Sequence, residues 1–332
     1  MYDVIYGQNI QSCIQEMIRS RQFGQRILGN SLSNEQQIIQ ALLDSKERLF
    51  FAEQGQIGGW TFQEQRILGG INIAMKVHIF DDGTWSFPNI HRYPFEGTLL
   101  FCPGPLLSRT DCWDHKFIVQ DGKIDPEKYA LVLEERIVPL LLYVQETAIE
   151  PSLVCLPGLG CGVFAGVFKG MISHLFIRTV RNILEKYSSR LSKIAMVYHY
   201  AYGPYESELR YEEQISETMR FVQWRNGPSM LSRPSVIDAD FHDGTPLFKF
   251  VAWDHFSWPG NDFFANSRQT DDGVSAAATS SMASLLEQPI GMIFRYERSK
   301  NKFLAFEGDR ERSWMNISPN QRLVPEQMLC LT

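Results

Sequence analysis

The sequence predicts an α/β protein in which helices cover both faces of a β-sheet. Short apolar runs, typical of buried strands, alternate with helical patterns along the chain. The run at residues 152–156 ends in a loop with glycines at positions 158, 160, 162 and 166, and an amphipathic helix follows up to Tyr187. The 332 residues, 44% of them hydrophobic and 21% charged, fit an ordinary globular protein.

Charge and cysteine content exclude several classes of function. The net charge of −6 leaves no general basic surface for duplex nucleic acid, so we expect no nucleic-acid partner. The six cysteines show no paired C-x-x-C zinc spacing, and we interpret them as reduced thiols of an intracellular, cytoplasmic protein. No apolar run approaches the ~20 residues of a membrane span, and the first residues lack a secretory signal. We expect a monomer without membrane contact; export by a specialised secretion machine stays compatible with these features.

Residues 1–50 indicate helices. A helix start is expected at Ser33, where Gln36 completes a capping box ahead of further apolar positions. An earlier apolar stripe recurs at helical spacing and comprises Ile10, Cys13, Ile14, Met17 and Ile18.

Residues 50–125 change to β-like runs at 66–75, 76–80 and 98–102, separated by glycine and proline turn signals. We expect residues 1–125 to form a helical and β elaboration packed on the core. Because the small-molecule site is expected elsewhere, this part is predicted to carry the surface for a protein partner.

The core is expected at residues 126–310, with 311–332 as a C-terminal tail. No linker separates these parts, so one compact domain is the preferred interpretation. A helix should begin after the N-cap Asp125, and Pro139 should kink it. The other expected elements are strands at 193–200, 235–239 and 247–253, helices at 206–230 and 273–287, and a hairpin of 291–296 with 302–307.

The glycine loop is the arrangement in which main-chain N–H groups wrap a phosphate. Its glycines do not fit the Gly-x-Gly-x-x-Gly register of a nicotinamide-dependent oxidoreductase. Lys169 is followed by Gly170, so a P-loop Gly-Lys-Ser/Thr is missing, and no Gly-x-Ser-x-Gly elbow occurs.

Four acids follow the strand at 247–253. Asp254 ends it, Asp262 lies in a Pro-Gly-Asn-Asp loop, and Asp271 and Asp272 stand at a helix start. Loops at the carboxyl ends of strands are where α/β sheets place their ligands, and clustered carboxylates supply general acid–base groups. Each acid taken singly could instead shape a turn or cap a helix. His199, His242 and His255 show no i, i+4 pair, so we expect no metal and no cofactor.

Residues 158–166 resemble the second phosphate loop of macrodomains, whose amides hold the diphosphate of ADP-ribose. The resemblance implies a three-layer α/β/α macrodomain-like mixed sheet. Residues 236–241 resemble the segment whose Asp reads adenine, which maps that role onto Asp240, and the turn at 272–274 resembles the first loop near the distal ribose. These motifs follow the phosphate loop instead of preceding it, so the order looks circularly permuted. The ligand-binding residues implied are Gly158, Gly160, Cys161, Gly162, Val163, Phe164, Asp240, Phe241 and Asp271.

The acid spacing is similar to that of an effector-type group of macrodomain ADP-ribosylhydrolases that includes MavL. This resemblance implies Asp254, Asp262 and Asp272 as catalytic residues, and ADP-ribosylated protein, with ubiquitin modified on arginine as one candidate, as the substrate. It also implies a bacterial effector acting in the host cytosol. The alternative is a reader that binds ADP-ribose without cleaving it, and the number of acids favours the enzyme.

Overall fold

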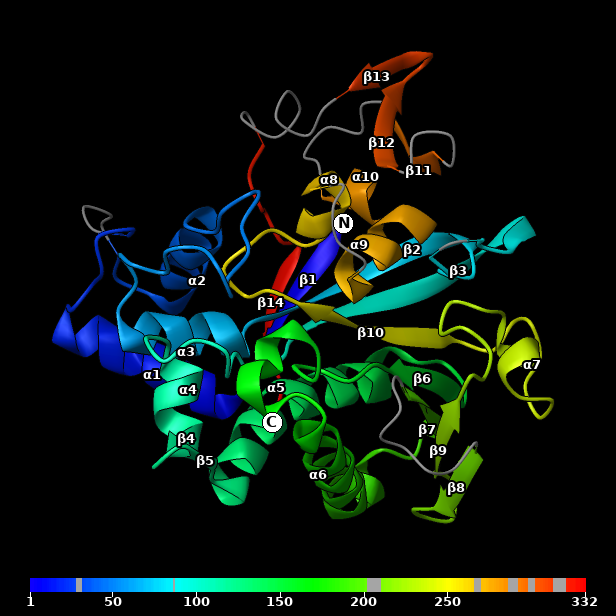
Figure 1. Ribbon diagram of the computed structural model, residues 1–332, viewed down its shortest axis with the longest axis horizontal. Coiled ribbons are helices and arrows are strands. Elements are labelled where there is room, and N and C mark those ends of the chain that lie inside the picture. Colours follow the sequence, from blue (N-terminus) through cyan, green and yellow to red (C-terminus); the bar gives the residue numbers. More distant parts are fainter. Residues whose placement is uncertain are drawn as a thin grey trace.

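The computed structural model in Figure 1 describes residues 1–27, 32–85, 87–201, 210–265, 270–285, 292–297, 302–312 and 321–332. The strands are β1 (Tyr2–Tyr6), β2 (Asn72–Asp81), β3 (Ile90–Pro103), β4 (Val119–Gln120), β5 (Lys123–Ile124), β6 (Ser152–Leu156), β7 (Ile194–Ala201), β8 (Arg210–Gln214), β9 (Arg220–Arg225), β10 (Leu247–Trp253), β11 (Met292–Glu297), β12 (Lys302–Glu307), β13 (Arg310–Arg312) and β14 (Gln327–Cys330). The α-helices are α1 (Gln8–Ser20), α2 (Glu35–Asp44), α3 (Phe62–Gly70), α4 (Trp113–Ile118), α5 (Pro126–Thr147), α6 (Met171–Tyr187), α7 (Pro234–Ile237), α8 (Asn261–Ala265), α9 (Asp271–Ala278) and α10 (Ser281–Ser284). Two 3₁₀ turns are η1 (Val163–Phe168) and η2 (Ser188–Arg190).

Nine of the described strands form one mixed sheet in the order β14-β1-β2-β3-β10-β6-β7-β9-β8. Strands β3, β10, β6, β7 and β9 run parallel to one another. Strands β2 and β8 pair antiparallel with this central group, and β1 and β14 extend the sheet beyond β2. The first and last described strands therefore belong to the same sheet as the strand that leads into the glycine loop.

The central strands supply alternate residues to two hydrophobic cores, because successive side chains of a strand point to opposite faces. Leu100 and Cys102 of β3 join the core that includes residues of α5 and α6. Leu99 and Phe101 join the core that includes residues of α1, α2, α3 and α9. Figure 1 shows α5 and α6 on one side of β10 and β6, and α8, α9 and α10 on the other. The predicted class, a mixed sheet with helices on both faces, is confirmed.

Several elements begin and end near their predicted positions. The Asp125 side chain accepts hydrogen bonds from two main-chain N–H groups at the start of α5, as an N-cap should, and Pro139 lies inside this helix. Strand β10 occupies residues 247–253 as expected, and β7 matches its predicted range within a residue. Strands β11 and β12 pair antiparallel, which confirms the hairpin, although its turn at 298–301 lies outside the described residues.

The N-terminal predictions were partly wrong. Residues 2–6 form the buried strand β1 ahead of the predicted helix. Helix α2 is capped by Asn34 instead of Ser33, because the Asn34 side chain accepts the hydrogen bond from the Gln37 N–H group. Residues 66–70 end helix α3, which a capping box between Thr61 and Glu64 starts, so the predicted strand begins only at position 72.

Two predictions near the far edge of the sheet were also wrong. The polar stretch expected to be a helix at 206–230 contains the edge strand β8 and its neighbour β9, and its residues 206–209 lie outside the described residues. The expected strand at 235–239 is instead the short helix α7, which begins at Pro234. The helix expected at 273–287 is divided into α9 and α10, with residues 286–287 outside the described residues. Within the described residues, no helix is long and apolar enough to cross a membrane.

Candidate functional site

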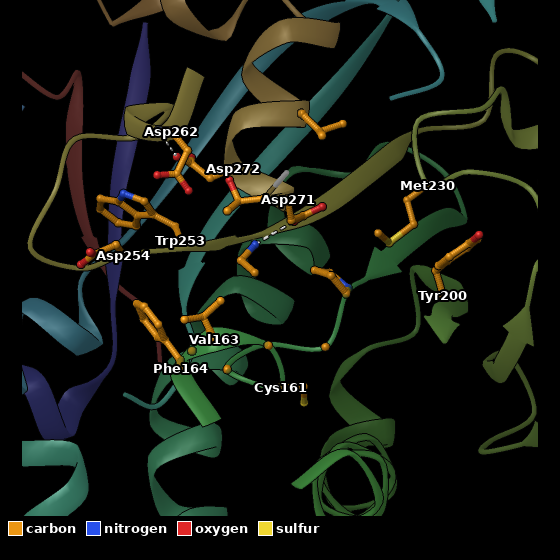
Figure 2. A pocket seen from close by; sticks show the side chains of 18 of the residues that line it. Cys161, Val163, Phe164, Tyr200, Met230, Trp253, Asp254, Asp262, Asp271 and Asp272 are labelled. Atoms are coloured by element: carbon orange, nitrogen blue, oxygen red, sulfur yellow. Dashed lines mark hydrogen bonds between the residues drawn. The ribbon is translucent and has the colours of Figure 1, made fainter. Parts of the chain in front are cut away.

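A cavity of about 750 Å³ lies at the carboxyl ends of the parallel strands β3, β10, β6 and β7. Its lining includes Gly104 after β3, Trp253 and Asp254 at the end of β10, Pro157 after β6, and Tyr200 of β7. The carboxyl ends of parallel strands meet at one edge, and ligands of α/β sheets bind there. Figure 2 shows the acids at one end of the cavity and Tyr200 at the other.

The loop between β6 and α6 forms one wall of this cavity through its residues 158 and 160–164. Gly160 has a φ of +72°, and a Cβ there would lie 2.9 Å from the carbonyl oxygen of Pro105. A Cβ on Gly104 would lie 2.1 Å from the Gly160 nitrogen, so the end of β3 and the loop pack backbone against backbone. The loop continues into η1 before α6 begins, and its consecutive residues 160–164 line the cavity. Main-chain N–H groups of such a loop can bind anions.

The buried Lys249 and the partly buried Asp271 form an ion pair in the same cavity. The Lys249 Nζ atom lies 2.7 Å from Asp271 Oδ1 and also donates to the Ser275 hydroxyl at 2.9 Å. Asp271 Oδ2 accepts the Ala252 N–H at 2.8 Å. Both carboxylate oxygens therefore bind groups of the protein, and the pair joins the start of α9 to strand β10.

Replacing Lys249 by methionine is expected to lower the free energy of unfolding by about 3 kcal/mol, because it leaves a partly buried carboxylate without its cation. Urea unfolding measures this loss. The matched control is Lys186→Met, which removes an exposed partner of Glu134 and is expected to cost at most about 1 kcal/mol. Equal losses in the two variants would contradict a structural role of the Lys249–Asp271 pair.

Asp254 extends strand β10 into the cavity and is held by two main-chain donors. Its Oδ1 accepts the Phe256 N–H at 2.8 Å, and its Oδ2 accepts the Ala52 N–H at 2.8 Å. Burial raises the pKa of the Asp254 carboxyl to about 7, although these two N–H groups and Lys46 oppose the rise. The carboxyl is thus poised to change protonation near neutral pH.

Asp262 and Asp272 come together where α8 meets α9. Asp272 Oδ1 accepts the Gly260 N–H at 2.7 Å, and Oδ2 accepts the Asp262 N–H at 3.4 Å. Burial, and then the Asp262 carboxylate, raise the pKa of Asp272 well above its usual range. Asp272 therefore holds a proton more readily than an ordinary carboxyl group, and other carboxyl groups lie beside it, an arrangement that can supply both a proton donor and a proton acceptor.

Tyr200 and Met230 line the opposite end of the cavity (Figure 2). His199 also lines the cavity and is buried. Its Nδ1 atom lies 2.8 Å from the Leu156 carbonyl oxygen, and burial lowers the pKa of the ring to about 4. His199 is therefore neutral at pH 7, with Nδ1 assigned as the donor to that carbonyl.

The structure brings most of the candidate residues together and leaves two of them out. The four acids from 254 to 272 and the residues of the glycine loop line one cavity. Asp240 and Phe241 line a second, more open cavity instead. The Asp240 carboxylate is exposed and lies 3.1 Å from the Arg220 guanidinium. The residue expected to read adenine is thus placed away from the glycine loop, because the chain at 236–241 forms the end of α7 and a turn on the far edge.

Sequence reasoning missed the part of the site that comes from the N-terminal region. Phe50, Phe51 and Glu53 line the acidic end of the cavity, although they precede the acids by some two hundred positions. Residues 82–85, which follow strand β2, line it as well. No local pattern marks these residues as part of a ligand site. Among the described residues, no group of three or more His, Cys, Asp or Glu side chains could hold a metal ion.

Comparison with protein families gives one match that spans most of the chain. The family model described as "Macrodomain effector MavL" matches residues 8–306. No curated protein matches the chain. The matched range includes the glycine loop, the four acids and the N-terminal residues that line the cavity.

Proposed function

Because the chain belongs to the MavL family of macrodomain effectors, we propose that it binds ADP-ribose in the cavity and releases it from modified proteins. Macrodomains in general bind ADP-ribose. The observation that carries the catalytic part of the proposal is the group of three carboxyl groups, Asp254, Asp262 and Asp272, at one end of a cavity whose wall is the glycine loop.

The charges in the cavity suggest how the ligand is oriented. The diphosphate lies along residues 160–164, where main-chain amides attract it despite the net charge of −6. The adenosine takes the uncharged end near Tyr200 and Met230, because carboxylates at the other end would repel phosphate. The distal ribose then reaches the acids, and Phe164 of the loop lies at that end (Figure 2).

In the proposed reaction, the acids catalyse hydrolysis at C1″ of the distal ribose. The bond from C1″ to the protein side chain breaks, and its electron pair leaves with the side chain while positive charge develops on the ribose. The Asp272 carboxylic acid gives its proton to the departing atom. A water molecule forms the new bond to C1″, and the Asp254 carboxylate accepts its proton. Asp262 keeps the Asp272 proton in place and orients the ribose hydroxyls.

The direct test mixes the protein with arginine-, glutamate- and serine-ADP-ribosylated proteins, ubiquitin among them, and follows free ADP-ribose by mass spectrometry. We expect release from at least one linkage, and the linkage that reacts identifies the substrate. Binding without release would select a reader of ADP-ribose. Neither binding nor release would reject the proposal.

The place of action follows from the same family. The family consists of effectors, which are proteins that act on a host cell. We therefore place the reaction in the host cytosol, with a host protein as substrate and ubiquitin as the first candidate. Detection of the protein in the host cytosol by fractionation of infected cells tests this placement.

A further inference from the structure

Residues 46–52 form a strap that crosses the loop carrying the acids. Glu47 pairs with the loop in a β-bridge: its N–H donates to the Phe256 carbonyl at 2.8 Å, and its carbonyl accepts the Trp258 N–H at 2.9 Å. The Asn261 side chain makes two hydrogen bonds to the main chain of Phe50. Its Oδ1 accepts the Phe50 N–H at 2.7 Å, and its Nδ2 donates to the Phe50 carbonyl at 2.8 Å. The strap thus fixes the loop between Asp254 and Asp262.

The strap also reaches Asp254 itself. The Ala52 N–H donates to Asp254 Oδ2 at 2.8 Å. At the other end of the strap, the Lys46 Nζ atom donates to the carbonyl of His255, the residue after Asp254. It also lies 4.4 Å from the ring centroid of Trp253, the residue before Asp254. One ammonium group therefore contacts both chain neighbours of this acid.

Lys46 is only 2% exposed, which makes it an unusual lysine. Burying an ammonium group is costly unless other groups stabilise its charge. Its surroundings here are a main-chain carbonyl, an aromatic face and the negative charge of Asp254. A hydrophobic side chain would fill this interior position at a lower cost in folding free energy. Packing alone therefore does not explain a charged side chain at position 46.

We propose that Lys46 is a positioning residue for the reaction, which keeps Asp254 ionised and fixes its direction at the end of strand β10. This inference rests on the proposed function, in which Asp254 accepts a proton from water. It assigns the N-terminal region a part in the chemistry in addition to any contact with a partner protein.

The charges around Asp254 give the sign of the effect. Lys46 favours the ionised carboxyl, whereas Asp262 of α8 disfavours it. Burial lowers the pKa of Lys46 to about 7, and the Asp254 carboxylate opposes this change, so each charged form stabilises the other. Burial keeps the neighbouring His255 neutral by lowering its pKa well below the usual range. Glu53 of the chain after the strap lines the same cavity and stays in every variant below.

Lys46→Met is expected to raise the pKa of Asp254 and to move the acid limb of kcat/KM for ADP-ribose release upward by about one pH unit. At pH values below the Asp254 pKa, kcat/KM of the variant is expected to be about tenfold lower than that of the wild type, and at high pH it returns to the wild-type value. Lys46→Gln is expected to give the same shift, while Lys46→Arg keeps the charge and restores the wild-type limb. Arg48→Met is the matched control, because Arg48 belongs to the same strap but packs over Trp258.

A second readout is independent of activity. In protein labelled with 13C-aspartate, the carboxyl signal that disappears in Asp254→Asn belongs to Asp254, and its titration gives the pKa directly. Lys46→Gln retains a hydrogen-bond donor for the His255 carbonyl and serves in place of Lys46→Met if the latter does not fold. An unchanged Asp254 titration in the neutral variants would overturn the inference. A shifted titration in a protein that releases no ADP-ribose would instead reject only the proposed reaction.

Discussion

Asp272→Asn is expected to lower the rate of ADP-ribose release by about 100-fold or more, the usual contribution of a general acid. The side chain is buried, and its pKa is raised well above the usual range by burial and by Asp262. Asparagine has nearly the same shape but carries no acidic proton. Single-turnover release of ADP-ribose measures the chemical step, and calorimetry on free ADP-ribose measures binding separately.

Asp254→Asn should lower the same rate to a similar extent, because an amide cannot accept the proton of water. Asp121→Asn is the matched control: it changes an exposed acid in the turn between β4 and β5 and should leave the rate unchanged. ADP-ribose affinity should fall much less than the rate in the cavity variants. Unchanged release in both Asp272→Asn and Asp254→Asn would show that these acids do not carry the reaction.

The second large effect is expected from Gly160→Ala, which should weaken ADP-ribose binding at least about tenfold. A residue with a Cβ pays about 1–2 kcal/mol at a φ of +72°. The added methyl would also lie 2.9 Å from the Pro105 carbonyl oxygen, so the loop must move away from the end of β3. Displaced amides would no longer converge on the diphosphate. Calorimetry gives the affinity, and thermal unfolding gives the stability.

Gly162→Ala is the matched variant within the same loop. A Cβ there meets no atom within 4 Å, and its φ of −87° lies outside the left-handed region, although its ψ of −123° is rare for a residue with a Cβ. Its losses of melting temperature and of affinity should be the smaller of the two, because the added methyl meets no neighbouring atom. Equal losses in the two variants would mean that the shape of the loop at Gly160 does not determine binding.

The sequence was sufficient to predict an element wherever all the residues that mark it lie in one short segment. The apolar run at 152–156, the glycines after it and the helical periodicity up to Tyr187 predicted one wall of the cavity. Strand β10 and the acids after it were equally clear, since a buried strand that ends on Asp254 has a distinct pattern. By contrast, β8 and β9 were mistaken for a helix. Strand β8 lies at the edge of the sheet and exposes polar side chains, and within its neighbour β9 residues 221 and 222 alone are buried, so neither strand shows a clear alternation of apolar residues.

The sequence by itself determined the α/β class, the glycine loop and the group of acids, because each depends on residues close together in the chain. Only the tertiary structure decided which acids share a cavity. It placed Asp240 on the far edge, and it brought the strap at 46–52 against Asp254 through hydrogen bonds from main-chain groups. Main-chain donors are the same for nearly every residue type, so a contact made through them leaves no mark in the sequence. The ionisation of Asp254 depends on such contacts and on the buried Lys46, and it is therefore a property of the folded chain.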